Sequence, residues 1–526
     1  MRALSIVVLA SLVFGGVGIA RSQAPSSAQP SDSGASALVR RLDSLARSAV
    51  SDGPLASVSV AVLRGRDTLL LRAYGMADIE ERAPAVVASQ YRLGSVTKSF
   101  TSAAILQQIE RGRLTLDDTL GKFFPQYTEW KAVRVRQLLN HTSGIPDYTA
   151  VGDAFNGSAA EEIPTDSIVG FVRGRPTKFP PGTKWSYSNT NYVLLGMILE
   201  QVTRAPYDEY LAQEVYTRAG LKQTMYCDDA TLQPHRALGY GRSHEQFVNA
   251  SAIAMTVPFA AGALCSTAED LARWARALRS GQVISQSSYH AMTTGEFAGR
   301  HLNPRDSTQQ YGYGVGMGML GSHHMVEHGG NINGFNASFI DVPDADVTVA
   351  ALTNTEGVGA DALARRLAQA ALSLPVDTTP RTPPEPTLAA RASLTPSASA
   401  KYFGRYRLHV MNAPLRAARV SITERVYEEG GRLLMWSPGS APTELVPLGN
   451  DRFANRSDPG TTFEFGADSA ASVALGESEG KTGGTAATRR TETNGAHGSN
   501  DGIRWLTLRV WNQPGFVLTG GRVAGP

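Results

Sequence analysis

Two β-hairpins lie far apart in the chain, and their separation constrains the fold more than any other feature. In the first, valines from Val58 to Val62 alternate with small residues, and a turn at 64–67 leads into a second strand. In the second, residues 337–342 and 347–352 flank a Pro-Asp-Ala-Asp turn. Such patterns predict antiparallel strands. Because helical and loop-rich sequence fills the interval, we expect an α+β fold in which both ends of a domain build one sheet.

The chain has 526 residues, which is too long for a single hydrophobic core. We expect the first domain to span 36–375, followed by an extended linker at 376–395 that is rich in proline and threonine. Beyond it, short strand-like pieces such as RLLMWSP, TELVPLG and RWLTLRV predict a small antiparallel β-barrel-like domain at 396–526. A Gly/Ala/Thr/Ser-rich stretch at about 468–500 is expected to be a disordered loop within it.

The N-terminus has the layout of a secretory signal peptide. Met1-Arg2 precede an apolar run that ends at about Ala20, and small residues follow. We expect residues 1–24 to be removed by a cut after about 20–24, and the mature protein to be periplasmic or secreted. The alternative is an uncleaved membrane anchor, although the run is barely long enough to span a bilayer.

Composition bears on partners and on redox state. The net charge is +3 with acids and bases interspersed, which argues against nucleic acid and anionic membranes as partners, and no stable membrane insertion is expected after signal removal. The two cysteines, Cys227 and Cys265, are compatible with a disulfide or with two buried free thiols. Their spacing does not indicate a zinc site.

The segment GSVTKSF places Lys98 three residues after Ser95, at the start of a helix predicted to end at Gly112. Residues three apart share a helical face, so the amine can approach the hydroxyl. Free backbone N–H groups at the helix start could hold an oxyanion. A lysine acts as a base only when its pKa is lowered, and this apolar helix favours burial. The alternative is an N-cap serine followed by a solvated lysine.

The same Ser-x-x-Lys pattern occurs a second time, which shows how weak it is alone. Ser478 and Lys481 lie in GESEGKTGG, which also spells GxSxG and KTG. GxSxG requires a strand-turn-helix elbow, and the low-complexity surroundings predict no helix. We interpret these matches as effects of composition.

Two further motifs accompany the first pair. WSYSNTNY contains Tyr187 and Asn189, and a phenol near a lysine can shuttle a proton while an amide orients the lysine or the substrate. VEHGGNINGF places His328 before Gly329 and Gly330. These glycines would let a substrate lie against backbone N–H groups, and the histidine offers a donor or a titratable charge. Taken singly, the motifs would be a loop tyrosine with an N-cap asparagine, and a turn between strands.

Residues 324–328 also spell HxxEH, a zinc-peptidase pattern in which two histidines share a helical face and the glutamate is the base. Glycines on both sides leave too few residues for a stable helix. A metallopeptidase is therefore a remote alternative, and we expect no metal site.

In this order, the three motifs resemble those of the penicillin-recognising serine hydrolases, which include serine β-lactamases, D-alanyl-D-alanine carboxypeptidases, and related esterases and D-aminopeptidases. The Tyr-x-Asn motif is more similar to the class C β-lactamase branch, and LLNHTSGIPDY at 138–148 also looks familial. The resemblance covers about 36–375. It implies a β-lactamase-like fold, with an antiparallel sheet flanked by helices and a helical insertion.

The resemblance also implies roles for individual residues. Ser95 is expected to be the acylated nucleophile, Lys98 and Tyr187 the proton-transfer pair, and Asn189 a positioning residue. The backbone N–H groups of Ser95 and Asn331 are expected to form the oxyanion hole, beside Gly329 and Gly330. No metal or organic cofactor is implied.

His328 departs from the family pattern, which has the lysine of a KTG triad at this position. A lysine offers a permanent charge to the carboxylate of a penicillin or a D-Ala terminus, whereas histidine is mostly neutral near pH 7. Some esterase and D-aminopeptidase relatives carry histidine there. We therefore expect a serine hydrolase of small ester, peptide or β-lactam-like substrates, with esters and short amides favoured. The alternative from another class is a catalytically silent protein that binds a peptide or glycan.

Overall fold

The computed structural model describes the following residues: 33–51, 53–150, 160–228, 230–243, 246–294, 309–357, 359–376, 400–410, 421–429, 432–436, 443–449, 451–455, 461–466, 505–510 and 517–523. Three predictions fall outside them: the signal peptide at 1–24, the linker beyond residue 376, and the loop at 468–500 with its second Ser-x-x-Lys pattern.

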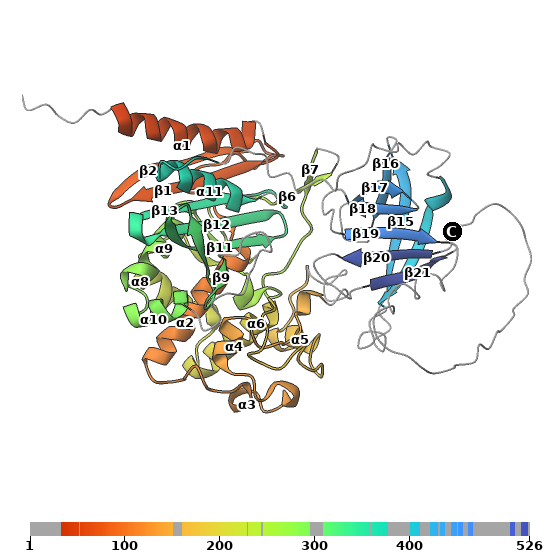
Figure 1. Ribbon diagram of the computed structural model, residues 1–526, viewed down its shortest axis with the longest axis horizontal. Coiled ribbons are helices and arrows are strands. Elements are labelled where there is room, and N and C mark those ends of the chain that lie inside the picture. Colours follow the sequence, from red (N-terminus) through yellow and green to blue (C-terminus); the bar gives the residue numbers. More distant parts are fainter. Residues whose placement is uncertain are drawn as a thin grey trace, which may run out of the picture.

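An eight-stranded antiparallel sheet forms the centre of the N-terminal part (Figure 1). In spatial order its strands are β3 (Ala83–Pro84), β2 (Asp67–Asp78), β1 (Ser57–Arg64), β13 (Val347–Thr353), β12 (Phe335–Val342), β11 (His323–Ile332), β10 (Gly316–Leu320) and β9 (Gln310–Tyr311). β1 pairs with β13 along its length, with Val60 opposite Ala351. The two hairpins of the sequence thus meet in one sheet, and the predicted fold class is confirmed.

Helices cover both faces of this sheet. Their bounds are α1 (Ser33–Ser51) and α11 (Ala360–Ala371) on one face, and α9 (Ala268–Ser280) on the other (Figure 1). Val60 packs towards α1 and α11, in a cluster with Leu42 and Leu363. Ala61, the next residue along β1, belongs to the second cluster, which contains Trp274 of α9. The small residues between the valines are therefore as buried as the valines themselves.

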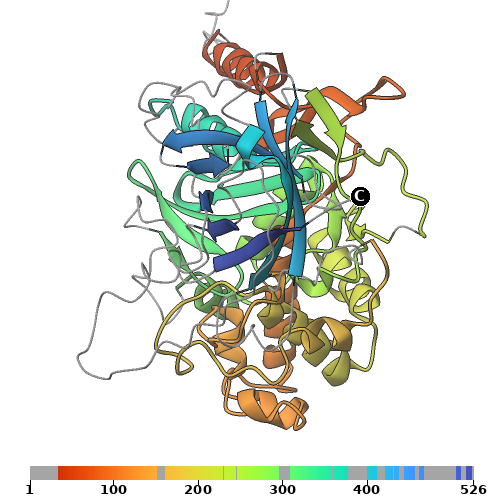
Figure 2. The same ribbon diagram turned by 90° about the vertical axis from the view of Figure 1, so that its right-hand side faces the viewer.

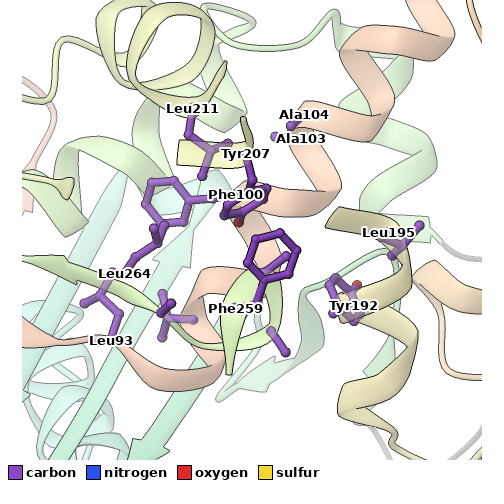
Figure 3. Packing of buried hydrophobic residues seen from close by; sticks show 14 of the residues in the cluster. Leu93, Phe100, Ala103, Ala104, Tyr192, Leu195, Tyr207, Leu211, Phe259 and Leu264 are labelled. Carbon is purple, nitrogen blue, oxygen red and sulfur yellow. The ribbon is translucent and has the colours of Figure 1, made fainter. Parts of the chain in front are cut away.

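Helix α2 (Thr97–Glu110) connects the sheet to a mainly helical region (Figure 1). Phe100 of α2 stacks on Trp274 with ring centroids 3.8 Å apart. Leu93, Tyr207 and Phe259 also belong to this buried cluster (Figure 3). The start of α2 is therefore held by apolar contacts from several separate segments. None of the helices within the described ranges has the length and apolar character needed to cross a membrane.

The rest of this part consists of further helices and short strands. Its helices are α3 (Leu120–Phe123), α4 (Val135–Leu139), α5 (Thr165–Gly170), α6 (Asn189–Thr203), α7 (Tyr207–Tyr210), α8 (Thr217–Ala219) and α10 (Gln286–Thr294). Its strands are β4 (Tyr91–Arg92), β8 (Leu264–Ser266) and β5 (Met225–Tyr226), which form one small sheet in this order, and the pair β6 (Tyr240–Ser243) and β7 (Gln246–Asn249).

A closed antiparallel barrel forms the C-terminal part, and it lies in front in Figure 2. Its strands are β14 (Gly404–Val410), β15 (Ser421–Glu429), β16 (Arg432–Trp436), β17 (Thr443–Gly449), β18 (Arg452–Asn455), β19 (Thr461–Gly466), β20 (Trp505–Val510) and β21 (Val517–Val523). β15 was missed by the sequence prediction because charged residues dominate SITERVYEE. Its Val426 is nevertheless buried in the barrel.

Candidate active site

Ser95 lies in η1 (Gly94–Val96), a 3-10 turn that leads into α2, and its side chain is partly exposed. Lys98 lies in the first turn of α2 and is completely buried. Its Nζ is 3.0 Å from Ser95 Oγ. The structure thus brings the two groups within hydrogen-bond distance. The alternative of an N-cap serine followed by a solvated lysine does not apply, because Lys98 is buried.

The surroundings of Lys98 prepare its amine to accept a proton. Burial lowers the pKa of Lys98 from 10.5 to about 7, while the Asp147 carboxylate acts to raise it. Nζ lies 2.8 Å from Asn189 Oδ1 and 2.8 Å from the carbonyl oxygen of Ala261, both of which can only accept. A neutral amine has two N–H groups and one lone pair. Because both N–H groups are taken, the lone pair remains for the Ser95 hydroxyl.

Asn189 is held in the orientation that this arrangement requires. It is the first residue of α6, and its backbone N–H donates to Asp147 Oδ1 at 3.1 Å. Its Nδ2 donates to Asp147 Oδ2 at 3.2 Å, so Oδ1 must face Lys98. The sequence prediction missed Asp147. The only signal for it was its place in LLNHTSGIPDY, where it is the one acidic residue and lies six positions after His141.

Tyr187 completes the set around the nucleophile. Its phenol is hydrogen-bonded to the Ser95 side chain. Lys98 Nζ lies 4.8 Å from the centre of its ring. Burial raises the pKa of Tyr187, so the phenol remains protonated at neutral pH. When Lys98 is neutral and accepts the proton of the Ser95 hydroxyl, the Tyr187 hydroxyl is the donor in its bond to Ser95 Oγ.

His141 anchors the chain on both sides of Tyr187, a role that the sequence did not predict. Its carbonyl oxygen accepts from the Ser186 N–H at 3.0 Å, and its Nδ1 accepts from the Ser188 N–H at 3.3 Å. Its ring lies 4.2 Å from the Tyr187 ring. Burial keeps the pKa of His141 well below its ordinary value, so the ring is a neutral acceptor.

His328 has different surroundings from those expected. Its Nδ1 donates to the carbonyl oxygen of Gly329 at 2.6 Å, so its Nε2 accepts from the Tyr311 hydroxyl at 2.9 Å. Burial and the nearby Lys98 lower the pKa of His328 to about 3. The ring is therefore neutral, and both nitrogens are bound within the protein. This arrangement does not fit the expectation that His328 presents a donor or a titratable charge to a substrate.

The glycines after His328 allow close packing against other parts of the protein. A Cβ on Gly330 would lie 1.9 Å from the carbonyl oxygen of Leu93, and one on Gly329 would lie 2.7 Å from the Asp361 carboxylate. Gly94 has a φ of +51°, and a Cβ on it would lie 2.9 Å from the carbonyl oxygen of Asn331. We expected these glycines to make room for a substrate. Instead, Gly330 lets β11 lie directly against the turn that carries Ser95, and Gly329 leaves room for Asp361 of α11.

Ser95 and Asn331 line the same open cleft, which has a volume of about 280 Å³. Its other walls include Asn189, Ala261 and Ile253. None of the described residues that line it carries a charged side chain. The cleft therefore suits a neutral group next to the nucleophile.

The HxxEH pattern lies in β11, a strand, and not in the helix that a zinc peptidase requires. Four residues of strand span about 13 Å, so His324 and His328 are too far apart to bind one ion. Within the described part of the chain, no three His, Cys, Asp or Glu side chains are grouped as metal ligands would be.

A disulfide joins Cys227 and Cys265, so the alternative of two free thiols does not apply. Cys265 lies in β8, which pairs with β4, and β4 leads into the turn that carries Ser95. The N–H of Leu93 donates to the carbonyl oxygen of Leu264. The crosslink therefore anchors the strand beside the nucleophile.

Comparison with known proteins agrees with this geometry. The profile of the beta-lactamase family matches residues 42–373. The chain belongs to the beta-lactamase family. Together with its relatives, this membership makes it a serine hydrolase of the β-lactamase fold.

Individual relatives cover well over half of the chain. Penicillin-binding protein 4* of Bacillus subtilis (strain 168) is 26% identical over 439 residues, which is 80% of this chain and 92% of that protein. The structure of a D-stereospecific amidohydrolase from Streptomyces sp. is 28% identical and covers 61% of this chain and 94% of its own, with a TM-score of 0.53. The octameric penicillin-binding protein homologue from Pyrococcus abyssi shares the fold at 21% identity, with coverages of 91% and 99% and a TM-score of 0.59.

Proposed function

We propose that this protein is an exported serine hydrolase that cleaves small esters or amides through an acyl-enzyme on Ser95. The observation that carries the proposal is the hydrogen-bond pattern of Lys98. Two acceptors, Asn189 Oδ1 and the Ala261 carbonyl, take both N–H groups of the neutral amine. The lone pair then faces Ser95 Oγ at 3.0 Å.

In the first half-reaction, Lys98 accepts the Ser95 proton while Oγ attacks the substrate carbonyl. The backbone N–H groups of Ser95 and Asn331, which both line the cleft, are our candidates for stabilising the oxyanion. The bond to the leaving group then breaks, and this group takes the proton from Lys98, directly or through the Tyr187 hydroxyl. In the second half-reaction, water gives a proton to Lys98 and attacks the acyl carbon. The bond between the acyl carbon and Ser95 Oγ then breaks, Oγ takes the proton back from Lys98, and the acid is released.

The uncharged lining of the cleft favours a substrate that is neutral around its reacting carbonyl. Among the described residues, its lining has no charged side chain, and His328 is neutral because burial lowers its pKa. A carboxylate next to the reacting carbonyl, as in a penicillin, would find no fixed positive charge in this lining. Esters and short amides are therefore the proposed substrates. The amidohydrolase among the solved relatives supports the same choice.

Export rests on two observations. Residues 1–24 have the layout of a signal peptide. The Cys227–Cys265 disulfide is a bond that persists mainly in oxidising compartments. The periplasm and the external medium are the proposed locations.

The test is hydrolysis of p-nitrophenyl acetate by the Ser95→Ala variant. We expect turnover to fall on the order of 10⁶-fold, because the acyl-enzyme cannot form. Ser280→Ala is the matched control, since Ser280 is an exposed residue at the end of α9. Nearly unchanged hydrolysis by Ser95→Ala would refute the assignment.

A fluorophosphonate probe followed by mass spectrometry separates the enzyme from the silent binding protein. We expect one adduct per chain, on Ser95. An unlabelled Ser95 in a folded protein would favour the binding protein, and an adduct on Ser478 would show that the other Ser-x-x-Lys pattern holds the nucleophile.

A further inference from the structure

A second cavity adjoins the cleft at Ser95, and the two spaces meet at Ile253 and Asn333. The second cavity is the larger one, with a volume of about 460 Å³ against about 280 Å³ for the cleft. Ile253 and Asn333 belong to the lining of both spaces. The nucleophile therefore lies in one part of a longer passage, and these two residues form the neck of the passage.

The first wall of the passage is the turn from β11 to β12. Ile332, the last residue of β11, lines the cleft, and Phe335, the first residue of β12, lines the second cavity. Asn333 lies between them in the chain. Its Nδ2 donates to the carbonyl oxygen of Ser251 at 3.0 Å, and this bond ties the first wall to the second.

The second wall is the segment 250–258. Val257 and Pro258 line the cleft, Ala252 lines the second cavity, and Ile253 lines both. Ile253 is only 7% exposed, because it also belongs to the apolar cluster beneath the site. Apolar side chains thus continue along both walls, from the space beside the nucleophile into the second cavity.

The passage suits an uncharged chain. Among its described residues, the lining of the cleft has no charged side chain. Arg92 and Arg236 line the second cavity, and both interact with other groups of the protein. An alkyl chain gains free energy from contact with apolar walls alone, so its binding requires neither arginine.

The passage leads away from the position of the leaving group. In the proposed reaction the Tyr187 hydroxyl, which is bonded to the Ser95 side chain, can return the proton to the leaving group. Tyr187 is absent from the described lining of both spaces, whereas Asn331, a candidate for the oxyanion hole, lines the cleft. The acyl part of the substrate is therefore the part that extends towards Ile253.

We propose that the passage binds the acyl chain of the substrate, and that Ile253 determines how long an acyl chain the enzyme accepts. The proposal rests on the proposed function and deepens it. A short acyl group would occupy the cleft alone, and a longer one would pass between Ile253 and Asn333 into the second cavity. The substrate class is therefore an ester or amide of an uncharged acyl chain of several carbon atoms.

The p-nitrophenyl esters of acetate, butyrate, hexanoate and octanoate test the proposal. For each ester, kcat/KM is divided by the rate constant of hydroxide-catalysed hydrolysis, and the octanoate value is divided by the acetate value. Each methylene that leaves water for an apolar wall is worth up to about fourfold. Because the walls also contain polar groups, we expect the wild-type protein to prefer octanoate only on the order of tenfold.

Two substitutions should change this preference in opposite directions. Ile253→Ala widens the neck and should raise the preference on the order of fivefold. Ala252→Phe fills the second cavity beyond the neck and should lower it by a similar factor. The matched control is Ile109→Ala, which removes the same atoms from α2 within the same apolar cluster and should leave the preference unchanged.

The preference is a ratio, so partial misfolding of a variant does not obscure it. If Ile253→Ala does not fold, Ala252→Phe carries the test, because Ala252 is exposed. No preference in the wild type, or one that survives Ala252→Phe, would overturn the acyl passage, and a preference that Ile253→Ala leaves unchanged would overturn the role of Ile253.

A second series separates the acyl part from the leaving group. Hydrolysis of ethyl acetate and hexyl acetate, followed by pH-stat titration, varies only the alcohol. We expect Ile253→Ala to leave the ratio of these two rates unchanged, and a change confined to this ratio would overturn the proposal. Failure of the wild type to hydrolyse p-nitrophenyl acetate would instead refute the acyl-enzyme proposal.

Discussion

Replacing Asp147 with asparagine tests how the active form of Lys98 is maintained. Asp147 raises the pKa of Lys98, against the larger opposite effect of burial. The asparagine has nearly the same size, and its single side-chain oxygen can still accept one of the two hydrogen bonds from Asn189. We therefore expect Asp147→Asn to lower the pKa of Lys98 below about 7 while leaving the fold intact.

The size of the effect follows from the geometry. The Asn189 side chain separates the two charges, with bonds of 3.2 Å to Asp147 and 2.8 Å to Lys98. At a separation of about 7 Å and an effective dielectric constant of about 20, Coulomb's law gives an upper value of ~2 kcal/mol. Asp147 is partly exposed, and solvent screening weakens this interaction. We therefore expect the pKa of Lys98 to fall by on the order of one in Asp147→Asn.

The assay is kcat/KM for p-nitrophenyl acetate between about pH 5 and pH 9, recorded at the isosbestic wavelength of p-nitrophenol. Only the neutral amine can accept the Ser95 proton, so wild-type kcat/KM should rise through about pH 7 and then level off. In Asp147→Asn the rise should begin at lower pH. The control is Asp166→Asn. Asp166 lies in α5, its carboxylate accepts a hydrogen bond from the Tyr127 hydroxyl, and its replacement should not move the pH profile. A rise centred near pH 10, or a shift of Asp147→Asn to higher pH, would refute the reasoning.

Two further changes test the scaffold. Gly330→Ala should lower the free energy of unfolding by about 1–3 kcal/mol and reduce esterase activity, because the new Cβ would lie 1.9 Å from a backbone oxygen. Thermal unfolding measures this. Replacing Cys227 and Cys265 with serine should lower the free energy of unfolding by ~4 kcal/mol, the loop-closure value for a sequence separation of 38. Denaturant titration measures this.

Each of these changes has its own control. Gly170→Ala adds a Cβ with no atom within 4 Å, so it should leave the transition temperature unchanged or raise it slightly. A Gly330→Ala protein as stable and active as the wild type would contradict the close approach of β11 to the Ser95 turn. For the cysteines, the wild-type protein under reducing conditions should match the double serine variant. Equal stability of the oxidised and reduced proteins would contradict the role of the crosslink.

Several features of this protein could be predicted from local sequence. Alternating valines and a Pro-Asp-Ala-Asp turn predicted the strands that became β1 and β13, because strand periodicity and turn chemistry act over a few neighbouring residues. The spacing of Ser95 and Lys98 predicted that their side chains lie on one side of a turn. Dependence on the local pattern also explains why β15 was missed. Its charged residues obscure the alternation of apolar and polar side chains that would have predicted a strand.

Tertiary structure alone decided what these residues can do. The pKa of Lys98 depends on burial and on Asp147, and its amine is oriented by the acceptors Asn189 and Ala261; all three residues come from distant segments of the chain. Likewise, His328 is bound and neutral because Tyr311 and its own backbone surround it, and the sequence predicted only an available histidine. The effects of desolvation and hydrogen bonding on a side chain depend on all the groups that the fold places around it. A sequence pattern can name a titratable side chain, but only the folded chain sets its protonation state and its partners.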